Sequence, residues 1–309
     1  MKALDCCAGA GGLSLGLQRA GFDVLGVELD ECAAETHRLN VGPCDTASLW
    51  DYEPRGEYDL VAGGIPCQSH STAGKRAGTC DPRGQLYVPF LRIAQQAKAR
   101  AVLIENVRGM MSSPSPTHGT AFREVVAAMN AAGFWHVVHA LLNAADYGVP
   151  QTRHRLFLVA FVSANSFSKF RCPLATHGPL TWRTVRQALA LGGGKFISGR
   201  TAKAVEKNWW NGGRIIDVDK PSSTILSRNN NDLLDVSSLY ASQLSLFETA
   251  APPRLERLTL EQMILLQSLP ASFCVSGIAE SQHRQVGNAV PPPLAEAVGR
   301  AVFDALRGE

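Results

Sequence analysis

The sequence lacks any apolar run that approaches the ~18 to 20 residues of a membrane-spanning helix. Its first residues, MKALDCCAGAGG, lead directly into a strand-and-turn pattern, without the apolar stretch and cleavage site of a secretory signal. We therefore expect a cytoplasmic protein without a membrane segment.

Patterns typical of metal and disulfide sites are also missing. The eight cysteines include no C-x-x-C pair, and the histidines have no spacing that is typical of metal ligands. Neither a zinc ribbon nor a disulfide framework is favoured over reduced, mostly buried thiols. We predict that the protein binds no metal.

Charged residues are few, at 18% of the chain, whereas hydrophobic residues make up 45%. This composition is typical of an ordinary globular protein. A length of 309 residues allows one large domain, or two unequal ones that each have a core.

What the sequence does contain is a regular alternation of strand-like and helix-like segments. Apolar runs of strand length occur in KALDC, DVLGVELD, YDLVAGG, AVLIENV and RLFLVAFV, and amphipathic segments of helix length lie between them. The first such helix has Leu13, Leu17 and Ala20 on one face and Gly21 as its stop. The alternation predicts an α/β fold with a mainly parallel sheet and helices on both faces.

Polar and small residues gather where these strands end, which is where open α/β sheets bind ligands. A glycine turn, Gly9 to Gly12, follows the first strand, and Glu28 ends the second. Glycines let a ligand approach the backbone, and an acid sixteen to nineteen residues later can accept both hydroxyls of a ribose. The pattern indicates a nucleoside-containing cofactor, with a purely structural turn as the alternative.

A basic stretch follows the last of these strands. From about residue 161 to 253 the regular periodicity fades, and between Lys169 and Arg228 eleven basic residues stand against three acidic ones. The local balance of +8 contrasts with +3 for the whole chain. This asymmetry indicates a surface that meets a polyanion, and a solvated accessory domain is the alternative.

Regular structure is expected to return near the C-terminus. RLTLEQMILLQSLP has Thr259 three residues before Gln262, the signature of a capping box at a helix start. QVGNAVPPPLAEAVGRAVFDAL predicts a polar turn followed by a final amphipathic helix.

Seven segments in order resemble the motif series of the cytosine-5 DNA methyltransferases of bacterial restriction-modification systems: DCCAGAGG, ELD, GGIPCQSHS, ENV, QTRHR, RLTLEQMILLQSLP and QVGNAVPP. The resemblance implies a Rossmann-like, S-adenosylmethionine-dependent methyltransferase sheet with a smaller, irregular target-recognition domain. We expect a catalytic, S-adenosylmethionine-binding domain at 1–160, a target-recognition domain at 161–270, and a C-terminal segment at 271–309 that returns to the catalytic domain.

The resemblance also implies catalytic roles. Cys67 in GGIPCQSHS would be the nucleophile that adds to carbon 6 of cytosine, because a thiolate is accessible near neutral pH. Glu105 would assist at N3, and Asn106 would hold the loop in register. Arg153 and Arg155 resemble the arginines that the family places beside the flipped base and its phosphate.

S-adenosyl-L-methionine is the cofactor that the resemblance implies, with Glu28 on the ribose hydroxyls and Asp45 on the adenine amino group. The candidate cofactor residues are Cys7, Ala8, Gly9, Ala10, Gly12, Glu28, Leu29, Asp45, Thr46, Gly64, Pro66, Leu86, Asn288, Ala289 and Val290. Cys7 and Leu29 stand where the family commonly has aromatic residues, a loss of ~0.5 to 1.5 kcal/mol of binding each. His70 also replaces a family phenylalanine.

The implied function is methyl transfer to carbon 5 of cytosine in a specific duplex DNA sequence, through a covalent Cys67 adduct and base flipping. A transfer-RNA cytosine-5 methyltransferase and a catalytically silent DNA-binding relative are the alternatives. The long basic insert and the ordinary PCQ context favour DNA. A silent relative is disfavoured by the intact Cys67, Glu105, Asn106, Arg153 and Arg155.

Double-stranded DNA is therefore the expected partner. A cognate restriction endonuclease that acts on the same site is a second partner suggested by the resemblance. We expect a monomer that is associated with the nucleoid through DNA. The recognition sequence is left open, because a few side chains that reach base edges decide it and no general code relates them to their target.

Overall fold

The computed structural model describes residues 1–65, 85–115, 118–190, 195–197, 215–225, 233–235 and 255–308. The chain forms two compact units. The first consists of Met1–Asn143, His154–Leu174 and Val290–Glu309, and the second consists of Ala144–Arg153 and Ala175–Ala289. The chain therefore leaves the first unit twice and returns to it twice.

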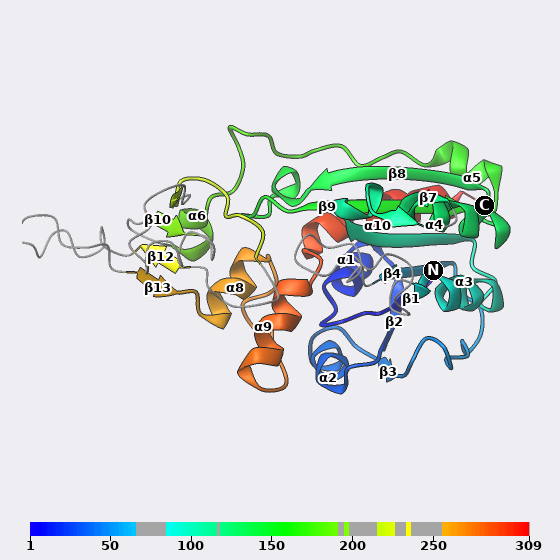
Figure 1. Cartoon of the computed structure of the whole chain (residues 1–309), viewed down its shortest axis with the longest axis horizontal. Helices are drawn as coiled ribbons and strands as arrows, with labels where there is room; N and C mark the ends of the chain where they lie inside the picture. The colour runs from blue at the N-terminus through cyan, green and yellow to red at the C-terminus, as the bar shows by residue number, and fades with distance from the viewer. Residues whose placement is uncertain are drawn as a thin grey trace, which may run out of the picture. The chain divides into compact units, whose positions relative to one another are not determined.

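A seven-stranded sheet with the order β3-β2-β1-β4-β5-β9-β8 forms the centre of the first unit (Figure 1). Its strands are β1 (Lys2–Cys6), β2 (Asp23–Glu28), β3 (Cys44–Thr46), β4 (Leu60–Gly64), β5 (Ala101–Val107), β8 (His136–Asn143) and β9 (His154–Phe161). The strands from β3 to β5 are parallel, and β9 is antiparallel to both of its neighbours. The mainly parallel sheet and the α/β class predicted from sequence are confirmed.

The described part of the first unit contains six α-helices, and several of them begin or end at residues suited to those positions. They are α1 (Gly12–Ala20), α2 (Glu31–Asn40), α3 (Tyr87–Gln96), α4 (Ala121–Ala131), α5 (Ala164–Lys169) and α10 (Pro292–Arg307). Gly21 ends α1 in the left-handed region, as its position predicted, and its N–H donates to the carbonyls of Leu17 and Gln18. At the start of α2, the side chain of Asp30 accepts from the backbone N–H of Ala33.

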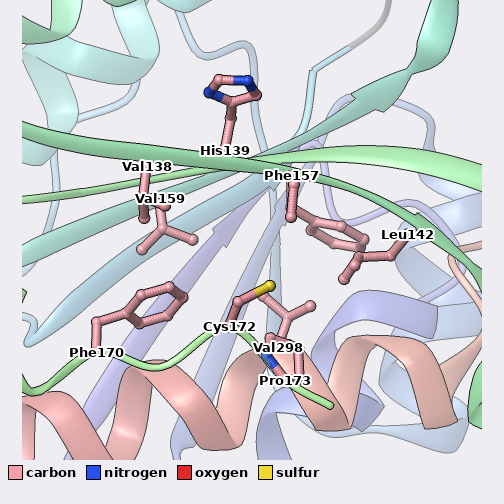
Figure 2. A pocket seen from close by; sticks show the side chains of 10 residues that line it. Val138, His139, Leu142, Phe157, Val159, Phe170, Cys172, Pro173 and Val298 are labelled. Carbon is pink, nitrogen blue, oxygen red and sulfur yellow. The ribbon is translucent and has the colours of Figure 1, made fainter. Parts of the chain in front are cut away.

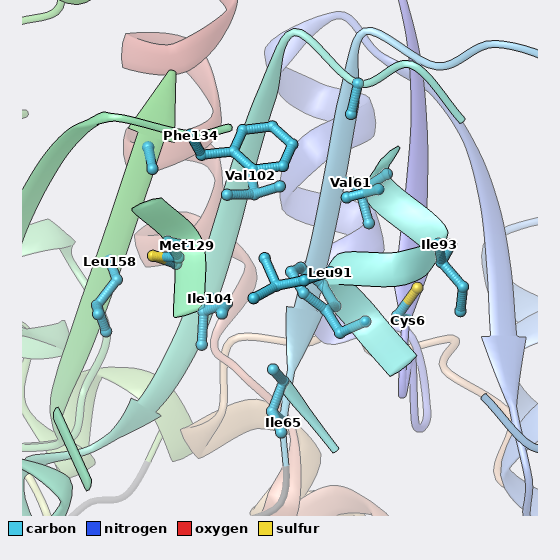
Figure 3. Packing of buried hydrophobic residues seen from close by; sticks show 14 of the residues in the cluster. Cys6, Val61, Ile65, Leu91, Ile93, Val102, Ile104, Met129, Phe134 and Leu158 are labelled. Atoms are coloured by element: carbon cyan, nitrogen blue, oxygen red, sulfur yellow. The ribbon is translucent and has the colours of Figure 1, made fainter. Parts of the chain in front are cut away.

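One face of the sheet packs against α3 and α4. Figure 3 shows Ile104 of β5 and Leu158 of β9 in one apolar cluster with Leu91 of α3 and Met129 of α4. Phe90 of α3 is fully buried in the same cluster. Because apolar contacts fix these strands along their length, the positions of their carboxyl ends are fixed as well.

In the same unit, α1 packs closely against α10. A Cβ atom on Gly16 would lie 2.3 Å from the Cβ of Ala295 and 2.6 Å from the backbone nitrogen of Glu296, so only glycine permits this approach. Figure 2 shows an apolar pocket between the β8–β9 pair and Val298 of α10, with Phe170 and Cys172 also in its lining.

The second unit contains a small antiparallel sheet with the order β11-β10-β12-β13. Each strand has three residues: β10 (Lys195–Ile197), β11 (Ile215–Asp217), β12 (Leu233–Asp235) and β13 (Leu255–Arg257). The helices of this unit are α6 (Val185–Leu189), α8 (Leu260–Leu266) and α9 (Ala279–Asn288). The short strands agree with the loss of periodicity that the sequence has in this region.

Two local expectations for the second unit have opposite outcomes. The capping box is confirmed: Thr259 accepts from the N–H of Gln262, and the Gln262 side chain accepts from the N–H of Thr259. The polar turn predicted for QVGN is wrong, because α9 continues to Asn288. Gln285, Val286 and Gly287 are buried, so packing overrides the weak helical preference of the segment. Within the described ranges, no helix has the length and apolar character needed to cross a membrane.

The contact of Gly16 with α10 predicts a loss of stability in the variant Gly16→Ala. The added methyl must push two helix backbones apart, and we expect the free energy of unfolding to fall by ~1 to 3 kcal/mol. Urea denaturation measures this change. Gly178→Ala is the control, because the added Cβ would meet no atom within 4 Å, and its midpoint should stay near that of the unchanged chain. Equal midpoints for both variants would contradict the close contact.

Candidate active site

The parallel ladder places the ends of five strands next to one another along one edge of the first unit's sheet. Glu28 pairs with Thr46 across β2 and β3, and Gly64 pairs with Glu105 across β4 and β5. Cys6, the last residue of β1, lies between these pairs, beside Gly63 and Val27. The candidate residues that the sequence spreads over about a hundred positions are therefore neighbours at this edge.

The turn after β1 is a left-handed one that is tied to the end of β2. Cys7, Gly9 and Gly11 have φ of +58°, +55° and +92°. One carboxylate oxygen of Glu28 accepts from the N–H of Gly9 at 2.8 Å, and the other accepts from the N–H groups of Leu29 and Asp30 at 2.8 and 2.9 Å. Glu28 thus fixes the glycine turn relative to β2.

The thiols beside this turn are poor nucleophiles. Burial, with smaller contributions from Glu28 and Asp5, raises the pKa of the Cys7 thiol well above its usual value. Burial likewise raises the pKa of Cys6, and it raises that of Cys44 to about 12. All three therefore stay protonated near neutral pH, and the thiolate is the reactive form.

Asp45 has two partners that the sequence did not reveal. One oxygen of its carboxylate accepts from the hydroxyl of Tyr52 at 3.0 Å, and the other accepts from Arg55 at 3.3 Å. A side chain seven or ten residues away follows no helix or strand period here, so no sequence pattern identified it. Leu29 is 71% exposed, so its side chain presents a free apolar surface beside the end of β2.

Glu105, near the end of β5, forms a buried ion pair with Arg155 of β9. The Nε of Arg155 lies 2.8 Å from one carboxylate oxygen, and the two side chains are only 12% and 10% exposed. A Cβ on Gly64 would lie 3.3 Å from the other oxygen of Glu105, so glycine lets β4 approach this carboxylate. Burial lowers the pKa of Arg155, while Glu105 opposes this shift. The pair holds the carboxylate in one orientation.

Asn106 fixes the backbone at the end of β4. Its amide nitrogen donates to the carbonyl of Ile65 at 3.2 Å, and its amide oxygen accepts from the N–H of Val107 at 2.7 Å. Ile65 is the last described residue before the segment 66–84. The candidates Pro66 and Cys67 lie outside the described residues. In the sequence they follow Ile65 by one and two positions.

In the second unit, Arg153 is buried and donates to three backbone carbonyls in two stretches of the chain. Its guanidinium donates to the carbonyl of Ile225 at 3.1 Å and to those of Gly287 and Asn288 at 2.9 and 3.4 Å. Arg153 is 1% exposed. The sequence predicted similar roles for Arg153 and Arg155, but their surroundings differ: one contacts backbone carbonyls and the other contacts a carboxylate.

The other candidates for the cofactor site vary in exposure. Ala8, Ala10, Gly12, Ala289 and Val290 are buried, Gly64 and Leu86 are half-buried, and Thr46 and Asn288 are exposed. Leu86 precedes α3, and its carbonyl accepts from Phe90. In the described part of the chain, no group of three or more His, Cys, Asp or Glu side chains is placed to hold a metal ion.

Comparisons with known proteins agree with this arrangement. The family model of the C-5 cytosine-specific DNA methylases matches residues 1–304. The Type II methyltransferase M.NgoMIV of Neisseria gonorrhoeae is 31% identical over 327 residues, which cover 99% of this chain and 98% of that protein. M.AplI of Arthrospira platensis is 32% identical over 98% of this chain and 85% of its own length.

Solved structures agree in fold. The methyltransferase EhMeth of Entamoeba histolytica superposes with a TM-score of 0.69 over 98% of both chains, at 14% sequence identity. The arrangement of strands and helices is thus shared at a level of identity where most side chains differ.

Proposed function

The chain belongs to the C-5 cytosine-specific DNA methylases, and on that basis we propose that Cys67 and Glu105 carry its chemistry. It transfers a methyl group from S-adenosylmethionine to carbon 5 of cytosine in DNA. The observation that carries the residue assignment is the end of β5, where Glu105 is oriented by Arg155 and the adjacent Asn106 anchors the carbonyl of Ile65.

Cys67 follows that anchored carbonyl by two residues, which favours it as the nucleophile over the buried thiols near the glycine turn. Carbon 5 of cytosine is a weak nucleophile by itself. When the Cys67 thiolate forms a bond to carbon 6, the ring's electrons are displaced and carbon 5 becomes able to attack a methyl group. After the transfer, a base removes the carbon-5 proton, the bond to Cys67 breaks, and the thiolate is released.

Glu105 would act on the opposite side of this electron flow. Negative charge develops on the ring at N3 during the addition, and Glu105 in its protonated form would stabilise it by donating a hydrogen bond or a proton. Arg155 holds the carboxyl group in place for this contact. We infer that Asn106 and Arg153 are positioning residues, since both contact backbone in the structure: Asn106 the Ile65 carbonyl, and Arg153 the carbonyls of Gly287 and Asn288.

The carboxyl edge of the sheet fits S-adenosylmethionine. When bound, the cofactor supplies an activated sulfonium methyl group. The turn from Cys7 to Gly12 would cradle its methionine part, Glu28 would receive the ribose hydroxyls, and Asp45 would accept from the adenine amino group. Leu29 offers an exposed apolar face for the adenine ring. Thr46, Gly64, Pro66, Leu86 and the stretch from Asn288 to Val290 would complete the pocket.

The basic stretch, which falls largely in the second unit, would recognise the DNA sequence, as the target-recognition domain predicted at 161–270. The target base must leave the duplex to react, at a cost of a few kcal/mol. We further propose that the enzyme acts as a monomer in the cytoplasm. The names of its relatives as Type II methyltransferases support a cognate restriction endonuclease as its partner.

The role of Cys67 predicts that Cys67→Ala abolishes methyl transfer and leaves S-adenosylmethionine binding largely unchanged. Duplex DNA with 5-fluorocytosine at the target should trap the unchanged enzyme covalently, because fluorine blocks the last elimination. Denaturing gels detect the adduct, and calorimetry measures cofactor binding. The exposed Cys274 provides the control, since Cys274→Ala should still form the adduct. Turnover by Cys67→Ala would refute the assignment.

The two carboxylates should separate in their kinetics. Glu105→Gln keeps the shape of the side chain but removes its charge and proton transfer, and we expect the single-turnover rate to fall ~10²- to 10⁴-fold with little change in cofactor affinity. Glu28→Ala should first weaken S-adenosylmethionine binding. Calorimetry with single-turnover rates distinguishes the two, and reversed effects would show that the roles are wrongly assigned.

The basic stretch predicts where salt dependence lies. Each phosphate that a basic side chain neutralises adds roughly −0.9 to the slope of log affinity against log salt, so losing one such contact flattens the slope by about one unit. A scan to alanine would cover Lys169, Arg171, Arg183, Arg186, Lys195, Arg200, Lys203, Lys207, Arg214, Lys220 and Arg228.

The structure refines the order of this scan. Arg183 and Lys220 are exposed, whereas Arg186 forms a two-point ion pair with Asp219, at 2.6 and 3.1 Å. We expect Arg183→Ala and Lys220→Ala to flatten the slope more than Arg186→Ala, their matched control. A residue that reads a base edge should instead relax discrimination at one base pair by ~1 to 3 kcal/mol. If no variant changes either quantity, recognition lies elsewhere.

A further inference from the structure

Three fully buried polar side chains form a hydrogen-bonded triad beside the glycine turn. The mechanism uses none of them. Asp5 of β1, Ser14 of α1 and His37 of α2 are each 0% exposed. A carboxyl oxygen of Asp5 lies 2.6 Å from the Ser14 hydroxyl, which lies 2.9 Å from Nε2 of His37. Nδ1 of His37 lies 3.2 Å from the carbonyl of Gly42. The triad connects β1, α1 and α2 next to the predicted cofactor site.

The hydrogen bond between His37 and the carbonyl of Gly42 determines where the protons of this triad lie. A backbone carbonyl only accepts, so Nδ1 of His37 must carry a hydrogen. If His37 is neutral, its Nε2 is an acceptor and takes the single hydroxyl proton of Ser14. The Ser14 oxygen is then an acceptor toward Asp5, which must itself be protonated to donate. If His37 is instead an imidazolium, its Nε2 donates to Ser14 and Ser14 donates to Asp5, which can then be a carboxylate.

Burial decides between these two arrangements. The second carboxyl oxygen of Asp5 is buried without a hydrogen-bond partner in the described part of the molecule. A carboxylate there would place a charge at a fully buried site, and this burial outweighs the hydrogen bonds from Ser14 that favour the charged form. Burial raises the pKa of Asp5 to about 7 and lowers the pKa of His37 to about 4, so both groups favour their neutral forms.

The charged groups around Asp5 and His37 also favour the neutral forms of both residues. Glu28 of β2 and Glu105 of β5 both raise the pKa of Asp5, because a third negative charge near them is unfavourable. Arg38 lowers the pKa of His37, and its own guanidinium pairs with Glu31 and Glu35. The remaining titratable neighbours are thiols with raised pKa values, namely Cys6, Cys7 and Cys44.

We propose that Asp5 keeps a proton in the folded enzyme in slightly acidic solution, and that Asp5, Ser14 and His37 are positioning residues that set the glycine turn for S-adenosylmethionine. Ser14 lies in the first turn of α1, two residues after the last glycine of the turn, Gly12. A Cβ on Gly11 would lie 3.0 Å from the His37 ring, and one on Gly26 would lie 2.8 Å from it. The ring therefore packs against both the turn and β2.

The proposal implies a dependence on pH with a definite sign. Asp5 is ionised above pH 3.8 in the unfolded chain but holds its proton to about pH 7 in the folded one. Its effect on stability is therefore a loss that develops as pH rises from about 4 to 7 and is complete above 7. His37 acts in the opposite direction between about pH 4 and 6.5. Above pH 7 Asp5 no longer donates to Ser14, and the support beneath the turn weakens.

The protonation state is tested in the full chain by the ¹⁵N resonances of the His37 ring at pH 6.5. We expect a neutral imidazole with its proton on Nδ1. An imidazolium, with both nitrogens protonated, would overturn the proposal, because Asp5 would then be the carboxylate. This readout is independent of the proposed cofactor site.

The positioning role is tested by calorimetry of S-adenosylmethionine from pH 6 to 9. The dissociation constant of the unchanged enzyme should rise above pH 7, by at most about tenfold per pH unit for one linked proton. Asp5→Asn places an amide N–H where the acid donated, so this rise should disappear while affinity at pH 6 stays within about twofold. Ser14→Ala removes the hydrogen bonds between Asp5 and His37 and should weaken S-adenosylmethionine binding at every pH.

Asp23→Asn is the matched control, since Asp23 is an exposed acid at the start of β2 and should leave the pH profile unchanged. Identical profiles for the unchanged enzyme and Asp5→Asn would overturn the positioning role. The proposal rests on the glycine turn being the cofactor site. Glu28→Ala distinguishes a failure of the positioning role from a failure of this site assignment. If that variant binds S-adenosylmethionine normally, the assignment of the site itself is wrong.

Discussion

The parallel ladder from β3 to β5 is the constraint on which the site depends. Its register puts Thr46 beside Glu28 and Gly64 beside Glu105, so residues that the sequence separates widely share one edge. The core beneath the sheet makes this edge rigid, because Ile104 and Leu158 are fixed by contacts with α3 and α4. A shift of one residue in any pair would turn a candidate side chain to the opposite face of the sheet.

Three acids lie close to this edge, and each is accommodated differently. Glu28 accepts three backbone N–H groups, which stabilise its charge while leaving it near the surface. Glu105 is buried and pairs with Arg155. Asp5 is fully buried with Ser14 as its partner, and we infer that it holds a proton. Glu28 and Glu105 raise the pKa of Asp5, because a third negative charge beside them is unfavourable.

The sequence predicted the parts of the molecule that local pattern controls. The strands that end at Glu28 and Glu105, the stop of α1 at Gly21 and the capping box at Thr259 all follow from period or capping chemistry. It did not predict β8, an edge strand whose residues are mostly only partly buried and so need no strict alternation. The same holds for the last turn of α9, which tertiary packing stabilises.

The contacts within the site were the least predictable part. Tyr52 reaches Asp45 from a segment that is neither helix nor strand, and His37 of α2 reaches Ser14 of α1, so the period of no single element relates either pair. Only the folded sheet brings such pairs together. A single sign was present in the sequence: Asp5 and Ser14 are polar residues within an apolar strand and an apolar helix face, where a polar group needs a buried partner.

The acids of this edge also bear on the choice of nucleophile. Burial, with a smaller contribution from Glu28, raises the pKa of the Cys7 thiol, and the same two causes raise the pKa of Cys44. The groups that suit a cofactor site thus suppress the thiolate form of the cysteines nearest to them. A reactive thiolate needs surroundings that do not raise its pKa in this way. We therefore infer that the chemistry lies on Cys67 rather than on Cys7 or Cys44.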